Sequence, residues 1–109
     1  MSATWTPISS EELQKEIDAG VSKMSARERV LWNFLRVTPR KWVLSPWGDQ
    51  GGGFWVVAIY GDACIYYNDI EKGFNMSRYA QHGVIADYFC NQDELQWVIF
   101  RMMEAIDAC

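Results

Sequence analysis

Two apolar runs joined by a Gly-Asp pair constrain the fold of this chain more than any other feature. Phe54 to Tyr60 and Ala63 to Tyr67 are rich in Trp, Val, Ile and Tyr, which fit the pleated surface of a β-sheet. Gly61-Asp62 is long enough only for a tight turn, so the two runs should pair as antiparallel strands. The runs therefore predict a hairpin within an antiparallel meander.

Two helices are expected before this hairpin. Ser9-Ser10-Glu11-Glu12 and Ser25-Ala26-Arg27-Glu28 are capping boxes, in which a serine and a glutamate three positions later satisfy free amides at a helix start. The first helix is expected to end at Gly20, and the second at about Val37 because Thr38-Pro39 follows. The apolar side of the second helix would comprise Met24, Val30, Leu31, Trp32, Phe34 and Leu35.

A third box, Asn91 to Glu94, predicts a C-terminal helix. Its apolar stripe would be Leu95, Ile99, Met102, Met103 and Ile106. Lys41 to Ser45 is expected as a strand before the hairpin, and Val84 to Phe89 as a fourth strand after it. We predict one α+β domain over residues 1 to 109, with residues 1 to 8 flexible. It has two N-terminal helices, a three- to four-stranded antiparallel meander sheet and an amphipathic C-terminal helix packed on the sheet.

Neither face of the first apolar run is polar, so both faces need cover. Alternate positions put Phe54, Val56, Ala58 and Tyr60 on one side and Trp55, Val57 and Ile59 on the other. A sheet with one face in water would alternate apolar and polar residues instead. One arrangement covers one face with the N-terminal helices and the other with the C-terminal helix. A second copy of the chain and another protein are the alternatives.

Charge is divided unevenly along the chain. Residues 1 to 41 carry seven Lys and Arg against five Asp and Glu, whereas residues 42 to 109 carry three against nine. Recognition of nucleic acids depends on basic side chains that neutralise phosphates, so this balance argues against a nucleic-acid partner. An acidic region rich in aromatic residues instead favours a basic protein partner.

The sequence contains no recognisable pattern of catalytic, metal-binding or phosphate-binding residues. Cys64, Cys90 and Cys109 lack the C-x-x-C spacing of redox and zinc sites, and His82 is the only histidine. The loop from Gly48 to Gly53 contains no lysine and precedes a strand, so it does not match a phosphate-binding loop. We interpret its glycines as residues that accept positive φ angles in a wide hairpin loop. We therefore predict no metal, no cofactor and no catalytic residue.

A cytoplasmic protein without a membrane partner is expected. Apolar runs such as Phe54 to Tyr60 are far shorter than the roughly 20 residues that cross a bilayer. The stretch Met1 to Trp5 lacks the basic and apolar regions of a secretory signal.

The stretch from Tyr66 to Asn75 is the most idiosyncratic in the chain, and two patterns, from Tyr67 to Asn75 within it and from Cys90 to Leu95, belong together. They read Y-N-D-I-E-K-G-F-N and C-N-Q-D-E-L, and together they resemble small bacterial proteins of uncharacterised function that pair these two patterns. The resemblance covers about residues 42 to 100. It implies a bacterial origin and the same α+β order, and it implies no mechanism. Because Asn68, Asp69 and Gly73 are turn-forming residues, a structured loop is the alternative interpretation of the first segment.

We predict a partner-binding surface of aromatic and acidic residues. Trp47 stands beside a turn, where an exposed indole commonly anchors an interface, and packing in the core is its alternative role. The residues assigned to the surface are Trp47, Asp49, Tyr66, Asp69, Glu71 and Tyr79. The predicted function is a non-enzymatic binding protein, most concretely an inhibitor or immunity protein for a basic, nuclease-like toxin domain.

Two other functions remain as alternatives. One is a small-molecule or peptide-binding domain, with a cleft bordered by Asp69, Asp87 and His82. The other is a self-associating accessory protein, in which a homodimer covers the second face of the sheet.

Overall fold

Four strands form one antiparallel sheet in the order β1-β2-β3-β4, preceded by two helices and followed by a third. The structure is a computed structural model and describes residues 5–108. Its elements are α1 (Ser10–Ser22), α2 (Ala26–Leu35), β1 (Arg36–Trp42), the 3-10 helix η1 (Asp49–Gly51), β2 (Phe54–Tyr60), β3 (Ala63–Asn68), β4 (Gly73–Arg78) and α3 (Leu95–Asp107). The predicted α+β class and the order of its elements are confirmed.

Both N-terminal helices start where the capping boxes predict. The Ser9 hydroxyl accepts the Glu12 amide at 3.1 Å, and the Ser25 hydroxyl accepts the Glu28 amide at 3.2 Å. The predicted end of α1 at Gly20 is wrong, because the helix continues to Ser22. Gly20 is instead the place where α1 meets the start of α3, since a Cβ there would lie 2.6 Å from the Leu95 Cβ.

β1 begins at Arg36 and ends at Trp42, so the predicted Lys41 to Ser45 strand is shifted toward the N-terminus. α2 ends at Leu35, and the chain is already extended when it reaches Pro39. Proline is tolerated there because β1 is an outer strand of the sheet. The amide hydrogen that proline lacks is not needed for a hydrogen bond to a strand on that outer side.

A β-bulge between Val56 and Ala58 changes which side chains share a face of β2. Phe54, Val56 and Ile59 pack on one side of the sheet, while Trp55, Val57 and Ala58 pack on the other. The expectation that Ala58 would share a face with Phe54 is therefore wrong.

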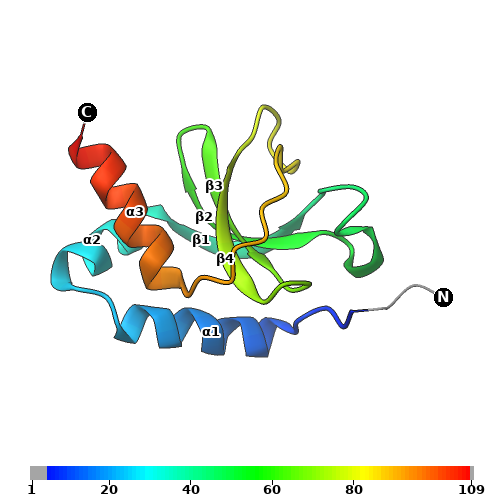
Figure 1. The fold of residues 1–109 in the computed structure, drawn as a ribbon, viewed down its shortest axis with the longest axis horizontal. Coiled ribbons are helices and arrows are strands. Elements are labelled where there is room, and N and C mark those ends of the chain that lie inside the picture. The colour runs from blue at the N-terminus through cyan, green and yellow to red at the C-terminus, as the bar shows by residue number, and fades with distance from the viewer. Residues whose placement is uncertain (1–4, 109) are drawn as a thin grey trace.

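All three helices pack against the same face of the sheet (Figure 1). The apolar cluster between them contains Leu13, Ile17, Met24, Trp32, Leu35, Val57, Ala58, Ile65, Tyr67, Phe74, Leu95, Val98, Ile99 and Met102. The arrangement with α3 on the opposite face is therefore wrong. Since α3 contacts α1, α2 and β4, the helices form a single layer.

The second face is covered by the chain itself, through residues 79–93, which we call the covering segment (yellow to orange in Figure 1). On the β1 side the Val43 amide donates to Gly83 O at 2.9 Å, and the Ile85 amide donates to Val43 O at 2.8 Å. On the β4 side the Ala86 amide donates to Arg78 O at 3.1 Å. The covering segment thus bridges the two outer strands of the sheet, and a second copy is not needed on this face.

The predicted strand from Val84 to Phe89 is wrong, because the fourth strand is Gly73–Arg78. Within the covering segment the backbone is bound mainly by side chains of β3 and β4. The Tyr66 hydroxyl accepts the Phe89 amide at 2.7 Å, and the Ser77 hydroxyl accepts the Asp87 amide at 2.9 Å. A regular ladder is therefore replaced by individual polar contacts.

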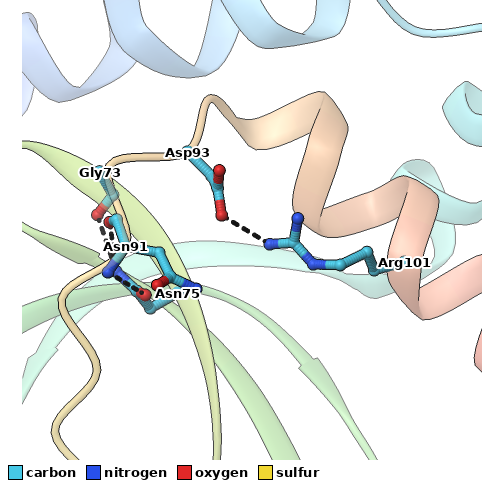
Figure 2. Close-up of polar contacts among 5 residues, drawn as sticks. All are labelled: Gly73, Asn75, Asn91, Asp93 and Arg101. Carbon is cyan, nitrogen blue, oxygen red and sulfur yellow. Dashed lines mark hydrogen bonds and ion pairs between the residues drawn. The ribbon is translucent and has the colours of Figure 1, made fainter.

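The segments from Tyr67 to Asn75 and from Cys90 to Leu95 meet at this point (Figure 2). Asn75 Nδ2 donates to Asn91 O at 3.0 Å, and the Asn91 amide donates back to Asn75 Oδ1 at 3.0 Å. Gly73 lies directly under the covering segment, and a Cβ there would overlap the carbonyl oxygen of Asn91. These residues hold the covering segment on the sheet.

The predicted cap of α3 at Asn91 is wrong, because the helix begins at Leu95, three residues further on than an Asn91 cap requires. The N-cap residue is Glu94, and its side chain makes no capping hydrogen bond. Asp93 binds Arg101 of α3 instead, with 2.7 Å between Oδ2 and Nη2 (Figure 2).

Candidate partner-binding surface

The meander brings most of the predicted partner-binding residues to one end of the sheet. The β1–β2 connection and the β3–β4 turn lie at the same end of an antiparallel meander. The first contains Trp47 and Asp49, and the second contains Asp69 and Glu71. We call this end, together with the start of α1, the acidic end.

Two predicted residues do not belong to this surface. Tyr66 has a relative exposure of 0% because its ring belongs to the apolar cluster of the second face. A ring in that position cannot contact a partner, and its expected exposure is wrong. Tyr79 lies at the opposite end, where its hydroxyl donates to Gly61 O at 2.7 Å.

The N-terminal segment from Trp5 to Ile8 crosses the acidic end and fixes the start of α1. The Trp5 ring stacks on Phe54 with 6.1 Å between the ring centroids. Trp55 Nε1 donates to Ile8 O at 3.2 Å, and the Ile8 amide donates to Asp69 Oδ2 at 2.8 Å. Residues 5–8, which were expected to be flexible, are therefore held against the sheet by these contacts.

A cleft of about 490 Å³ opens between this segment, α1 and the β3–β4 turn. It is lined by Trp5, Thr6, Pro7, Ile8, Glu12, Glu16, Tyr67, Asp69, Ile70 and Lys72. Three of these side chains are carboxylates and one is an amine, so the lining carries a negative surplus.

Asp69 is the deepest carboxylate of the cleft, with a relative exposure of 6%. Its Oδ2 accepts the Ile8 amide, while its buried Oδ1 has no hydrogen-bond partner among residues 5–108. Burial raises the pKa of Asp69 above its ordinary value, and the hydrogen bond from the Ile8 amide opposes that rise. The turn itself is held by Asn68, whose Oδ1 accepts the amides of Ile70 and Glu71.

The pKa of the Tyr67 hydroxyl is raised in part by the negative charge of the cleft. Burial is the main reason that the pKa of Tyr67 is raised to about 12, and the carboxylates of Glu16, Asp69 and Glu12 raise it further. Each of these groups opposes a second negative charge at the phenol. The cleft therefore favours a cationic group and disfavours an anion.

Ion pairs within the chain neutralise much of the acidity of its C-terminal part. Lys23 pairs with Glu94 at 2.6 Å, and Arg27 pairs with Asp107 at 3.3 Å, so two basic residues of the N-terminal part bind acidic residues at the two ends of α3. Two further pairs join Arg78 to Asp62 and Arg101 to Asp93. Within residues 5–108 the carboxylates that form no ion pair include Glu12, Glu16, Asp69 and Glu71. Carboxylates without an ion pair are thus left at the acidic end, and Asp18, Glu28, Asp87 and Glu104 are others elsewhere in the described chain.

Trp47 adds an aromatic surface beside this end. Its ring stacks on Tyr88 of the covering segment, with 4.6 Å between centroids and 16° between planes. The indole has a relative exposure of 46%, so one part packs on the protein and the other part meets solvent. Asp49 is held nearby by the Ser45 hydroxyl, which donates to its Oδ1 at 2.6 Å.

Sequence reasoning missed Glu12, Glu16 and Tyr67 as members of this surface. Glu12 and Glu16 are four residues apart and share one face of α1, a spacing that the sequence does contain. That spacing does not show which element packs beside this face of α1. Only the fold shows that Asp69 of the β3–β4 turn lines the same cleft.

The side chains considered for chemistry are separated. Burial raises the pKa of the Cys64 thiol to about 12, so this cysteine stays protonated and unreactive. His82 lies beside Trp42, with 4.7 Å between the ring centroids, and lines a hollow next to β1, whereas Asp69 lines the acidic cleft. Residues 5–108 contain no cluster of three metal-binding side chains. Cys109 lies outside the described residues.

The glycine-rich loop has a structural explanation. Gly52 and Gly53 have φ angles of 78° and 107°, as the hairpin interpretation predicted. A Cβ at Gly53 would also overlap the carbonyl oxygen of Trp42. The two glycines therefore let the loop turn back closely against the end of β1.

No family model, curated protein or solved structure matches this chain. In the part of the chain that the structure describes, no helix is both long and apolar enough to cross a bilayer.

Proposed function

We propose that this chain is a non-enzymatic protein-binding domain that docks a basic partner at its acidic end. The observation that supports this most is the cleft between α1 and the β3–β4 turn, in which Glu12, Glu16 and Asp69 form no ion pair within residues 5–108. A surface of this kind attracts lysine and arginine side chains and speeds encounter with a basic protein. Trp47 provides an aromatic anchor at the margin.

The most concrete form of the proposal is an inhibitor or immunity protein for a nuclease-like toxin, acting in the cytoplasm. Toxins that cut nucleic acids need positive surfaces, and an acidic inhibitor complements such a surface directly.

Capture of a partner from source cells, followed by affinity measurements at increasing salt, tests it. We expect Glu16→Gln with Glu71→Gln to weaken binding about 10-fold at low salt, because each removes a carboxylate that forms no ion pair within residues 5–108 from the proposed interface. The matched control is Asp62→Asn with Glu104→Gln, which removes the same charge elsewhere and should leave the affinity nearly unchanged. Equal weakening by both variants, or binding indifferent to salt, would refute the proposal.

A further inference from the structure

Asp69, which lines the cleft between α1 and the β3–β4 turn, has a buried oxygen atom that lacks a partner. Its Oδ2 accepts the Ile8 amide at 2.8 Å, while Oδ1 has no hydrogen-bond partner among residues 5–108. The amide of Asp69 itself favours the ionised carboxylate but makes no hydrogen bond to Oδ1. Lys41, whose charge also reaches Asp69, donates its ammonium to Gly51 O instead. Since a buried polar atom is normally bonded, the cleft lacks a donor that a bound molecule can supply.

The charges of the cleft are not neutralised within the chain. Glu12 uses one oxygen, Oε1, to accept the amide and the hydroxyl of Ser9. Glu16 and Asp69 form no ion pair within residues 5–108, and neither does Lys72, the one cation of the lining. Three carboxylates therefore face a single amine, and a cation that enters the cleft finds them without ionic partners.

The shape of the cleft favours an organic cation over a metal ion. Within residues 5–108 no three carboxylates lie close enough together to hold one ion, so those of the cleft are spread around its lining. The volume of about 490 Å³ is within the range of sites for small organic ligands. The half-buried ring of Trp5, with Ile8 and Ile70, adds apolar walls.

A guanidinium group suits such a site better than an ammonium group does. It is planar, carries five N–H donors and is weakly hydrated, so it can bond to several carboxylates and pack on an aromatic ring at the same time. An ammonium group is a compact and strongly hydrated charge, and it loses more hydration free energy beside apolar walls.

We infer that the cleft is a binding site for an arginine side chain, whose guanidinium donates to Asp69 Oδ1 and is attracted by Glu12 and Glu16. The inference rests on the proposed function, because it names the side chain that the basic partner presents to the acidic end. Binding energy would then be concentrated at one residue of the partner, as is usual at protein interfaces.

Titration of the full chain with three capped amino acids, followed by two-dimensional NMR, tests the inference without a partner protein. The probes are N-acetyl-arginine amide, the lysine compound of equal charge, and the citrulline compound of similar shape without charge. The arginine compound should shift the signals of the Ile8 and Asp69 amides and the Trp5 indole to saturation. Its dissociation constant should be about 5-fold lower than that of the lysine compound. The citrulline compound should not saturate them.

Variants locate the site. Asp69→Asn should weaken binding of the arginine compound by at least about 10-fold, because it removes the buried charge. Glu16→Gln, at an exposed residue that does not affect folding, should weaken it about 3-fold. Lys72→Gln removes a like charge and should strengthen it. The control is Glu104→Gln, an exposed carboxylate of α3 outside the cleft, which should leave binding unchanged.

Equal binding of the arginine and lysine compounds overturns the inference, and so does binding that Glu16→Gln and Asp69→Asn leave unchanged. The outcome is separate from that of the proposed function. A basic partner that binds in a salt-dependent manner, together with an arginine compound that does not bind, would overturn the arginine site alone. An arginine compound that binds as expected, with no basic partner captured, would keep the site and count against the proposed function.

Discussion

The two faces of the sheet are covered by different kinds of structure and held by different interactions. Side chains of β3 alternate between them: Tyr66 and Asn68 bind the backbone of the covering segment, whereas Ile65 and Tyr67 lie under the helices. A helix satisfies its own amides and carbonyls, so apolar side chains are enough to hold it. A buried coil brings free backbone groups with it, and the sheet must supply polar partners.

This difference explains the polar residues buried on the second face. Asn68, Asn75 and Ser77 are each less than 4% exposed, and each bonds to the backbone of the covering segment. These three polar side chains therefore lie where the covering segment, which has no regular secondary structure, crosses the sheet. We expect the coil-covered face to be the more sensitive of the two to small changes.

The largest effect is expected from a comparison of two glycines. Gly73→Ala should lower the free energy of unfolding by about 3 kcal/mol, because the new methyl group meets backbone atoms of Asn91 and Gln92 that cannot move without unseating the covering segment. Gly20→Ala should cost less, since better helix propensity returns about 1 kcal/mol against the contact with Leu95. Urea denaturation of both variants measures the difference. A larger loss for Gly20→Ala would contradict the greater sensitivity of the coil-covered face.

An intermediate effect is expected from two neighbouring tyrosines. Tyr66→Phe should lower the free energy of unfolding by about 2 kcal/mol, because it leaves the part-buried Phe89 amide without its acceptor. Tyr67→Phe is the matched control on the helix-covered face. It should change stability by less than about 0.5 kcal/mol, since the Tyr67 hydroxyl faces carboxylates that raise its pKa.

Hydrogen exchange separates these two variants further. The Phe89 amide should exchange faster in Tyr66→Phe and at its native rate in Tyr67→Phe, because local opening of the covering segment follows the loss of its contacts. Equal stability of the two variants would show that the hydroxyl of Tyr66 does not hold the segment.

Local signals account for what the sequence predicted correctly. The serines at Ser9 and Ser25 fix helix starts through bonds that span three residues, and Gly61-Asp62 fixes the hairpin through its length alone. Gly20 and Gly73 show why the rest could not be predicted. Both are glycines because another part of the chain passes close by, at Leu95 in one case and Asn91 in the other. A single sequence does not distinguish that cause from a helix end or a turn.

The candidate surface was predicted in part for the same reason. Trp47, Asp49, Asp69 and Glu71 share an end because the order of a meander puts its connections there. Tyr66 was misplaced because its ring was counted among the aromatic anchors of a binding surface, while the structure buries the ring and uses its hydroxyl inside the protein. The pattern from Val84 to Phe89 predicted a strand, and nothing in it showed that this segment would instead cross the sheet as a coil and bury the Tyr66 ring.

The smallest effect on the free energy of unfolding is expected from lowering the pH, through Asp69 in the β3–β4 turn. Burial raises the pKa of Asp69 above 3.8, so the folded state holds its proton more tightly than the unfolded state does. The stability from this difference is fully present below pH 3.8 and is lost as pH rises through the folded pKa. Relative to Asp69→Asn, the wild-type chain should therefore gain stability as pH falls from 7 toward that range.

Chemical denaturation of both proteins at several pH values measures this gain. Glu71→Gln, a change in the same turn at a carboxyl that is not buried, should show no such trend against the wild type. A stability difference between wild type and Asp69→Asn that is flat with pH would contradict the raised pKa of Asp69.

Neither outer strand of the sheet is open for another chain to join. Beside β4, the Phe74 amide donates to Asp93 O and the Ala86 amide donates to Arg78 O, so the covering segment occupies that margin. Along β1, Pro39 lacks an amide hydrogen, and basic side chains repel an approaching copy. As described over residues 5–108, the folded chain therefore offers no template for cross-β growth, and fibres would have to begin from molecules whose covering segment has come away.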